Sequence, residues 1–428
     1  MRRGYKQTEV GIIPDEWDVK PLGNLFGFSG GYSASRAQLT TEGHCYLHYG
    51  DIHGATKTWV DTGVDYQDIP KLDIPLKRVS SRSLLEDGDV VFVDASEDDE
   101  GTSKHVVVLN KENMPFISGL HTIVAKSKTD ELVHEYRRYC FQTTVVRQQF
   151  LFYAVGTKVV GISKSNIPKV FLPVPTPPEQ HAIATALNDV DALLGGLDRL
   201  IAKKRDLKQA AMQQLLTGET RLPGFRGEWE VKRLEDFGTT YGGLTGKTKA
   251  DFGAGTAQYI NFMNVMTNVV IDREIFERVN VSPIETQNRA KKGDLFFNGS
   301  SETPEEVAMC AVLLEEVQDV YLNSFCFGFR FREGAEADGV FFAYYLRGRE
   351  GRELMKSLAQ GSTRYNLSKV ALLNSSLRLP TLPEQTAIAA VLSDMDAELS
   401  ALVARRTKTR ALKQAIMQEL LTGRTRLV

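Results

Sequence analysis

The stretch PPEQHAIATALNDVDALLGGLDRLIAKKRDLKQAAMQQLLTGETRL, residues 177–222, occurs again as LPEQTAIAAVLSDMDAELSALVARRTKTRALKQAIMQELLTGRTRL, residues 382–427. Self-similarity at a fixed spacing indicates a duplicated structural unit. Upstream anchors repeat as well, because Gly88-Asp89 matches Gly293-Asp294 and Trp17 matches Trp229. The copies of the quoted stretch agree at about half of their positions, whereas the regions before them share only scattered residues. The chain is therefore two units, each a globular part followed by a helical part.

The ends of the repeated stretch carry helix signals. Thr176-Pro-Pro-Glu179 and Thr381-Leu-Pro-Glu384 are typical of capping boxes, with a hydroxyl at the N-cap and a glutamate three residues later. Gly218 and Gly423 are typical C-terminal caps. Between these signals we expect a helix of about ten residues and then a longer one, starting near Asp189 or Asp394, which at ~1.5 Å per residue is ~40 Å long.

The longer helix carries a narrow apolar stripe at three- and four-residue spacing. Its members are Val190, Leu194, Leu197, Ile201, Leu207 and Ala211 in the first copy, and Met395, Leu399, Leu402, Leu412 and Ile416 in the second. Such a stripe predicts helix-on-helix packing along a coiled-coil-like seam. The alternative is that each stripe packs only on its own globular domain.

The globular parts have an α+β pattern. Short β-rich runs are bounded by turn residues, at 89–96, 117–126, 294–300 and 324–331. Apolar helical stretches follow at 130–142 and 338–350. We therefore expect two mixed domains of strands and helices.

Composition sets broad limits on function. The 428 residues carry a formal net charge of −2, which does not exclude a local basic face. The four cysteines have no metal-binding spacing, which favours reduced thiols and no zinc site. Neither a signal peptide nor a membrane-spanning stretch is evident, so we expect a cytoplasmic protein.

Catalytic motifs fail when their spacing is examined. GGLTGKTK at 242–249 resembles a nucleotide-phosphate loop, but Tyr241 stands where that motif needs its first glycine. PDEWDVK at 14–20 holds both halves of a nuclease pattern too close together to surround one metal ion. His105, His121 and His134 have no matching histidine in the second copy, which excludes a repeated histidine-based active site. We therefore predict no catalytic residues and no metal site in this chain.

Basic and hydroxyl-bearing residues do recur at matching places. They are Ser33, Ser35 and Arg36 beside Thr245, Lys247, Thr248 and Lys249 near the start of each unit, and Lys158, Ser163 and Lys164 beside Arg364, Tyr365, Ser368 and Lys369 near its end. Such groups, with nearby glycines, hold nucleic-acid phosphates. Any single one of them could equally belong to an ordinary solvated loop. The recurrence of the pattern in two divergent domains favours DNA binding.

With these features together, the chain resembles specificity (S) subunits of type I restriction–modification enzymes over essentially its whole length. The most specific motifs are PEQHAIATALNDVDALL…LKQAAMQQLLTG (178–218) and PEQTAIAAVLSDMDAEL…LKQAIMQELLTG (383–423). IPDEWDVKPLGNLF (13–26) and GEWEVKRLEDFG (227–238) resemble the segments that open each target-recognition domain, and GTKVVGISKSNI and GSTRYNLSKV those that close them.

The resemblance implies target-recognition domains at 1–176 and 219–381 and conserved helical spacer regions at 177–218 and 382–428. The spacer helices would pair antiparallel, giving a pseudo-two-fold internal repeat, and would act as a ruler. They would also dock two methyltransferase (M) subunits, which restriction/translocase (R) subunits join. S-adenosylmethionine, ATP and Mg²⁺ would then be bound by the partners, and this chain would hold no cofactor.

The expected function is non-catalytic recognition of double-stranded DNA at a bipartite, asymmetric site with an unread spacer. An alternative is the recognition part of a fused type II-like methyltransferase or nuclease whose catalytic function escapes recognition. A helical scaffold without any DNA role is a third class. Salt-dependent DNA binding and activity without partners separate the three.

Overall fold

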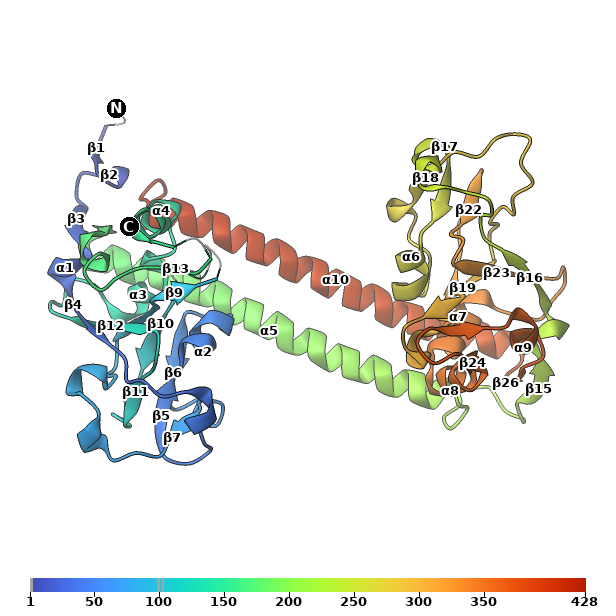
Figure 1. Cartoon of the computed structure of the whole chain (residues 1–428), viewed down its shortest axis with the longest axis horizontal. Coiled ribbons are helices and arrows are strands. Elements are labelled where there is room, and N and C mark those ends of the chain that lie inside the picture. Colours follow the sequence, from blue (N-terminus) through green and yellow to red (C-terminus); the bar gives the residue numbers. More distant parts are fainter. Residues whose placement is uncertain (1–2, 98–100, 102–103, 157) are drawn as a thin grey trace. The chain divides into compact units, whose positions relative to one another are not determined.

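The computed structural model describes residues 3–97, 101, 104–156 and 158–428, and Figure 1 labels its elements. Contacts within the chain divide it into two compact units. Unit 1 consists of Met1–Leu197 and Arg405–Val428, and unit 2 of Asp198–Ala404. Each unit thus combines one globular part with the first half of the long helix that follows it and the end of the other long helix.

The core of unit 1 is a five-stranded sheet of order β4-β12-β8-β10-β6. Its strands are β4 (Phe26–Gly30), β12 (Thr122–Ser127), β8 (Val90–Val93), β10 (His105–Leu109) and β6 (Trp59–Asp61). Neighbours run antiparallel except β10 and β6. The run Val90–Val93 is buried on both faces, as continuous β-branched and aromatic stretches favour.

Smaller elements complete unit 1. A second sheet is formed by β11 (Phe116–Ser118), β5 (His44–Leu47) and β7 (Lys71–Leu72) and shares a hydrophobic core with the first. Three strand pairs are β1 (Tyr5–Thr8) with β2 (Gly11–Pro14), β3 (Asp18–Pro21) with β14 (Phe171–Val174), and β9 (Ala95–Ser96) with β13 (Val160–Gly161). The short helices are α1 (Leu22–Leu25), α2 (Tyr49–Gly54), α3 (His134–Cys140) and α4 (Thr144–Tyr153).

Unit 2 repeats the core of this topology, with four strands in its central sheet where unit 1 has five. Its central sheet has the order β16-β23-β19-β21, with β16 (Gly238–Gly242), β23 (Cys326–Phe331), β19 (Leu295–Asn298) and β21 (Cys310–Val312). Two three-stranded sheets are β18 (Glu277–Val279), β17 (Phe252–Ile260) and β22 (Val320–Leu322), and β20 (Ser300–Ser301), β25 (Tyr365–Leu367) and β24 (Ala359–Gln360). β15 (Glu230–Arg233) pairs with β26 (Ser376–Leu379). The short helices are α6 (Phe262–Thr267), α7 (Gly339–Arg347), α8 (Arg349–Leu358) and α9 (Lys369–Leu373). The α+β prediction is confirmed.

The two long helices are α5 (Pro177–Leu215) and α10 (Leu382–Leu421), each continuous over its whole length. The expected division into a short helix and a longer one beginning near Asp189 or Asp394 is therefore wrong. No proline lies beside either aspartate to remove a backbone hydrogen bond, so each helix continues past it. Along the described residues no helix is long and apolar enough to cross a membrane.

A buried glutamate ties the start of each long helix to its unit. Glu179 accepts a hydrogen bond from Trp17 Nε1 at 2.7 Å and pairs with Arg426. In unit 2 the matching Glu384 pairs with Arg221. Both glutamates that were predicted for capping boxes thus have tertiary partners, and a guanidinium binds a buried carboxylate by strong charge-assisted hydrogen bonds. Gly218 and Gly423 do have the positive φ of C-terminal caps, 73° and 68°.

A matched cluster fixes the helix pair in each unit. In unit 1, Asp191 accepts from Tyr139 Oη at 2.8 Å and from Lys413 Nζ at 2.6 Å. In unit 2, Asp396 accepts from Tyr344 Oη at 2.6 Å and from Lys208 Nζ at 2.5 Å. Each aspartate therefore joins a helix to its own globular part and to the other long helix. The repeat extends to the polar contacts and not only to the backbone.

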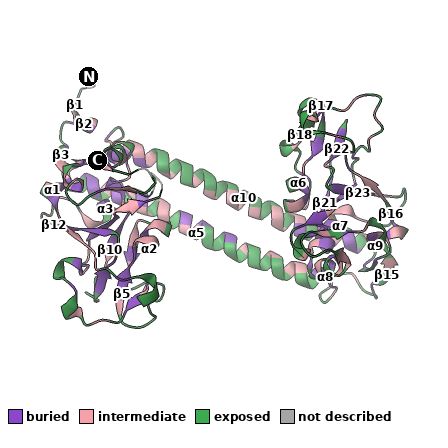
Figure 2. Ribbon diagram, viewed as in Figure 1, coloured by how far each residue is buried: buried purple, intermediate pink, exposed green. Residues whose placement is uncertain are grey.

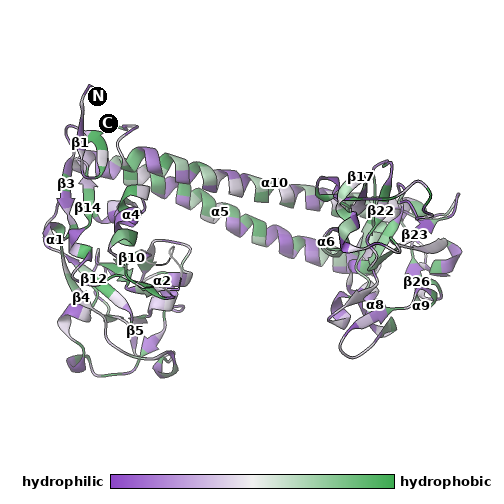
Figure 3. Cartoon of the chain, turned by 45° about the horizontal axis from the view of Figure 1, so that its top comes forward, coloured by the Kyte–Doolittle hydropathy of each residue, from purple (hydrophilic) through white to green (hydrophobic). Residues whose placement is uncertain are grey.

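The predicted apolar stripe holds over part of its length. Leu194, Leu197 and Ile201 are buried, while Leu207 and Leu412 are 47% and 56% exposed. Figure 2 shows mostly buried strands and long helices rich in exposed residues, and Figure 3 shows hydrophilic and hydrophobic residues mixed along both helices. The two leucines were thus wrongly placed in the packed seam, since residues at a regular spacing can face solvent as well as a partner.

Candidate nucleic-acid interface

The basic segments near the start and end of each unit lie together in the structure. A Cβ atom built on Gly30 would lie 3.1 Å from Lys164 Nζ, and one built on Gly242 would lie 3.6 Å from Lys369 Nζ. Both glycines are the last residues of the edge strands β4 and β16. Segments more than 120 residues apart in sequence therefore meet in each unit. We call this meeting point the basic cluster: Lys164 beside Gly30 in unit 1, and Lys369 beside Gly242 in unit 2.

The second glycine of each pair is required by close backbone contact. A Cβ atom on Gly31 would lie 1.8 Å from the carbonyl oxygen of Gly119, and one on Gly243 would lie 2.1 Å from that of Asn323. Real side chains do not tolerate such distances. The Gly-Gly repeat thus brings the loop after the edge strand against the turn before the neighbouring strand, β12 or β23.

The loop residues of unit 1 are exposed but partly engaged. Ser35 Oγ contacts Gln38 Oε1 at 3.2 Å, and Arg36 pairs with Asp51 at 3.3 Å. Ser163 Oγ lies 2.8 Å from Ser165 Oγ. The remaining predicted residues, Ser33, Lys158 and Lys164, are also exposed. Thr157, within the same closing segment, lies outside the described residues.

In unit 2 the closing segment presents its charges beside aromatic rings. The Arg364 guanidinium lies 5.7 Å from the ring centre of Phe325, and Lys369 Nζ lies 5.7 Å from that of Phe327. Tyr365 lies in β25, and Ser368 caps α9 by accepting from Ala371 N. These positions hold both cations at the surface in defined places.

The loop GGLTGKTK is held by contacts with Asp251 and with the segment 280–287. Thr245 N donates to Gln287 Oε1 at 3.1 Å, and Thr248 Oγ donates to Asp251 at 2.9 Å. Lys247 donates to the carbonyl oxygen of Asn280 at 2.6 Å and pairs with Glu285 at 2.6 Å. The side chain of Lys247 is only 5% exposed, while Lys249 is exposed. The expectation that Lys247 faces DNA is therefore corrected: its charge is neutralised by Glu285 of another segment, so the ion pair joins the two segments.

This ion pair predicts a pH-dependent loop. Hydrogen bonds from Lys247, from Ser282 N and from Gln287 hold the pKa of Glu285 down at about 2, against an ordinary 4.5. Because the folded pKa is depressed, the contact stabilises the loop above pH 4.5 and is lost as the pH falls toward 2. We expect hydrogen-exchange protection of Ser282 N, after correction for intrinsic rates, to fall across this window. Glu285→Gln should remove that pH dependence, and an unchanged profile in the variant would contradict the assignment.

Sequence reasoning missed the exposed rings beside these clusters. His121 and Phe325 lie on the turns that precede β12 and β23 and are largely exposed. They share no residue type, so self-comparison of the sequence could not match them. The one signal in the sequence was that each of these two residues comes just before an apolar run that predicts a strand.

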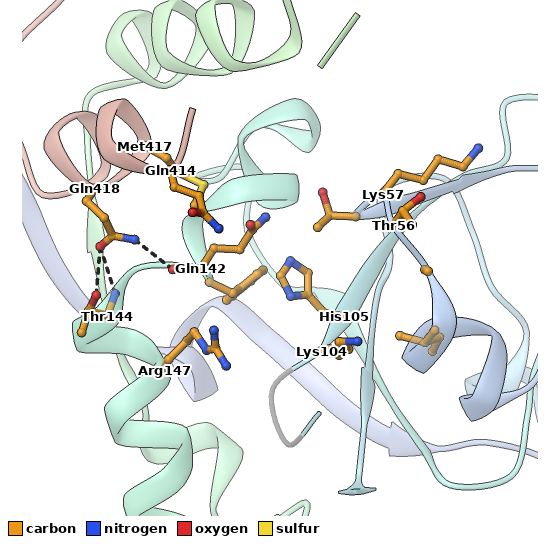
Figure 4. A pocket seen from close by; sticks show the side chains of 14 residues that line it. Thr56, Lys57, Lys104, His105, Gln142, Thr144, Arg147, Gln414, Met417 and Gln418 are labelled. Atoms are coloured by element: carbon orange, nitrogen blue, oxygen red, sulfur yellow. Dashed lines mark hydrogen bonds between the residues drawn. The ribbon is translucent and has the colours of Figure 1, made fainter. Parts of the chain in front are cut away.

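A separate pocket of about 340 Å³ lies in unit 1 (Figure 4). Its polar lining includes Lys57, Lys104 and Arg147, and Gln418 of α10 accepts a hydrogen bond from Thr144 N at 3.1 Å. Lys57 already pairs with Asp65, and Lys104 donates to the carbonyl oxygen of His53. Lys104 comes directly after residues 102–103, which lie outside the described ranges. We assign no ligand to the pocket.

Groups suited to catalysis are weakly represented. In the described ranges no cluster of three or more histidine, cysteine or acidic side chains could hold a metal ion. The cysteines are buried, and burial raises the pKa of the Cys310 and Cys326 thiols to about 12. Both thiols are therefore protonated at neutral pH and poor nucleophiles.

Comparison with known proteins identifies the class. Residues 14–202 and 226–409 match the family model described as type I restriction modification DNA specificity domain. Because the two matches span most of the chain, the protein belongs to this family.

Relatives and solved structures agree with this membership. A specificity subunit assigned to the type I restriction enzyme MjaX of Methanocaldococcus jannaschii is 23% identical over 99% of this chain and 97% of its own length. The MjaVIII specificity subunit of the same organism is 23% identical over 68% and 70%. The S subunit structure from M. genitalium superimposes with a TM-score of 0.54 at 15% identity, covering 94% of this chain and 96% of its own. A chain from a study of type I R-M complex assembly has a TM-score of 0.58 at 17% identity, covering 96% and 99%.

Proposed function

We propose that this protein is the DNA-recognition subunit of a type I restriction–modification complex. Each unit reads one half of a bipartite, asymmetric site on double-stranded DNA, and the bases between the halves are not read. The observation that carries this proposal is the duplicated cluster in which two distant basic segments meet at the same edge of two similar sheets. Base edges in the major groove carry the sequence information. Two similar scaffolds that present different loops to these edges can therefore recognise two different half-sites.

Catalysis then resides in partner subunits. We propose that methyltransferase subunits, one for each repeated unit, and restriction/translocase subunits supply the chemistry and bind S-adenosylmethionine, ATP and Mg²⁺. The domain limits remain those expected from the sequence, with recognition domains at 1–176 and 219–381 and spacers at 177–218 and 382–428. A cytoplasmic location follows for a complex that acts on cellular DNA.

A face of α5 suits partner docking. Leu193, Leu200 and Leu207 recur every seven residues and are 44%, 40% and 47% exposed. Residues seven apart share one helix face, and an apolar row on one face of a helix suits contact with another protein. This row supports docking of a methyltransferase subunit on the spacer helix.

A salt titration tests the phosphate contacts. Lys369→Ala should weaken binding to all duplex sequences and lower the slope of log affinity against log salt by about 1, because one counterion fewer is released. Lys356→Ala in α8, whose lysine pairs with Glu305, is the control and should leave the slope unchanged. An unchanged slope in Lys369→Ala would contradict its assignment to a phosphate.

A matched insertion tests the ruler. Four residues added between Leu197 and Asp198, and four between Ala404 and Arg405, lengthen both helices by just over one turn, or ~6 Å, at the boundaries between the two units. We expect methylated-base mapping, with the methyltransferase partner present, to show both half-sites unchanged and a different permitted spacer. Altered bases within a half-site would refute the ruler.

A further inference from the structure

The two units present a ring at the same structural position. Ile123 of β12 pairs with Gly30, and Phe327 of β23 pairs with Gly242. His121 and Phe325 each lie two residues before these paired residues. The carbonyl oxygen of His121 accepts from Asp94 N at 3.2 Å, and that of Phe325 accepts from Gly299 N at 2.8 Å. His121 and Phe325 are therefore structural counterparts.

Both rings are held outward by a constrained turn. The His121 side chain is 52% exposed, and its backbone has a φ of 57°, which non-glycine residues rarely adopt. Phe325 is 59% exposed. Asn323 fixes the Phe325 turn, because its Oδ1 accepts from Phe325 N at 2.9 Å and its carbonyl oxygen accepts from Cys326 N at 3.0 Å. A phenyl ring kept exposed on a rigid turn suits contact with an apolar group of a ligand.

In unit 2 the neighbours place the Phe325 ring beside the basic closing segment, whereas in unit 1 they place the His121 ring beside Asp94 and Tyr49. Gly243 packs on the carbonyl oxygen of Asn323, and the Arg364 guanidinium lies 5.7 Å from the Phe325 ring centre. In unit 1, Asp94 Oδ1 lies 3.3 Å from His121 Nδ1, and the Tyr49 ring meets the imidazole edge-on at 5.4 Å. The Nδ1 side of the imidazole thus faces protein.

We propose that His121 and Phe325 are the corresponding base-reading residues of the two units. Phe325 contacts the 5-methyl group of a thymine in the half-site of unit 2. His121 forms a hydrogen bond to a base edge in the half-site of unit 1 through Nε2. In the major groove only thymine offers a methyl group, and the other base edges differ in their donors and acceptors. The same structural position holds a phenyl ring in unit 2 and an imidazole in unit 1. The two units therefore recognise different bases in their half-sites. This inference rests on the proposed function.

Selection from a random duplex pool tests the assignment, using the full chain with its methyltransferase partner. The wild type should select two half-sites. Phe325→Ala should lose preference at one base pair of the unit 2 half-site, and His121→Ala at one base pair of the other. Val231→Ala, at an exposed valine of β15, is the control and should change neither half-site.

Deoxyuridine then tests the methyl contact. Replacing the thymine at the Phe325-dependent pair removes only that methyl group, so wild-type affinity should fall about fivefold, near 1 kcal/mol. Phe325→Ala should bind both duplexes equally. Preference retained at the other base pairs of the unit 2 half-site in Phe325→Ala shows that the substituted unit is folded.

The outcomes test the proposed function and the base-reading roles of His121 and Phe325 separately. If the wild type selects no sequence, the proposed function itself fails. If it selects two half-sites but Phe325→Ala keeps both, this inference alone fails. A uniform loss of affinity in Phe325→Ala that is insensitive to deoxyuridine would indicate a wedge between bases and overturn the methyl contact. A loss of partner binding without loss of base preference would indicate a protein contact and overturn it too.

Discussion

Gly243→Ala should destabilise unit 2 by about 3 kcal/mol, near the upper end for a side chain forced into a packed site. The added Cβ would lie 2.1 Å from the carbonyl oxygen of Asn323 and 2.8 Å from that of Leu322. Both are backbone atoms of the sheet edge, so they cannot move aside as a side chain would. Hydrogen exchange of peptides covering β16 and β23 should show the loss, with unit 1 peptides unaffected.

Gly242→Ala is the matched control one residue away. Its Cβ would meet Lys369 Nζ at 3.6 Å, an ordinary contact with the end of a flexible side chain. We expect stability to change by less than about 1 kcal/mol, because alanine restricts the unfolded chain more than glycine does. Equal effects of the two substitutions would show that backbone contact does not explain the second glycine.

Glu384→Ala should cost unit 2 about 2 kcal/mol. The carboxylate is 1% exposed and pairs with Arg221, whose side chain is 24% exposed. Removing one partner of a buried pair costs about 3–5 kcal/mol, and the partial access of Arg221 to water reduces that figure. Denaturant unfolding of the full chain, followed by exchange of peptides from β15 and β26, measures the effect.

Glu398→Ala provides the comparison on the same helix. Glu398 pairs with Lys204 at 2.6 Å, but its side chain is 49% exposed. Exposed pairs contribute less than about 1 kcal/mol, since water solvates both charges nearly as well. A loss as large as that of Glu384→Ala would mean that burial does not decide the strength of these pairs.

Local patterns predicted the secondary structure well. The runs at 89–96 and 294–300 form β8 and β9, and β19 and β20, because consecutive β-branched and aromatic residues pack on both faces of a strand. The division of α5 and α10 was wrong. Helix propagation needs no signal of its own, and a favourable N-terminal sequence inside a helix does not interrupt it.

The candidate interface was predicted less completely. Residue type identified Arg364 and Lys369, both exposed beside rings. It failed for Lys247, because a lysine looks the same in sequence whether its side chain faces solvent or pairs with a glutamate of another segment. The sequence did not show that His121 and Phe325 are equivalent, because their equivalence depends on strand register.

The amino-acid sequence by itself determined the duplication, the α+β composition, the long helices and the family, since each depends on residue spacing within a short segment or on comparison of one segment with another. Tertiary structure decided which charges are available and which segments meet. Lys164 reaches Gly30, and Lys369 reaches Gly242, only because the sheets bring together strands far apart in the chain. The side-chain environment decides whether a lysine can meet a phosphate, and non-local packing creates that environment.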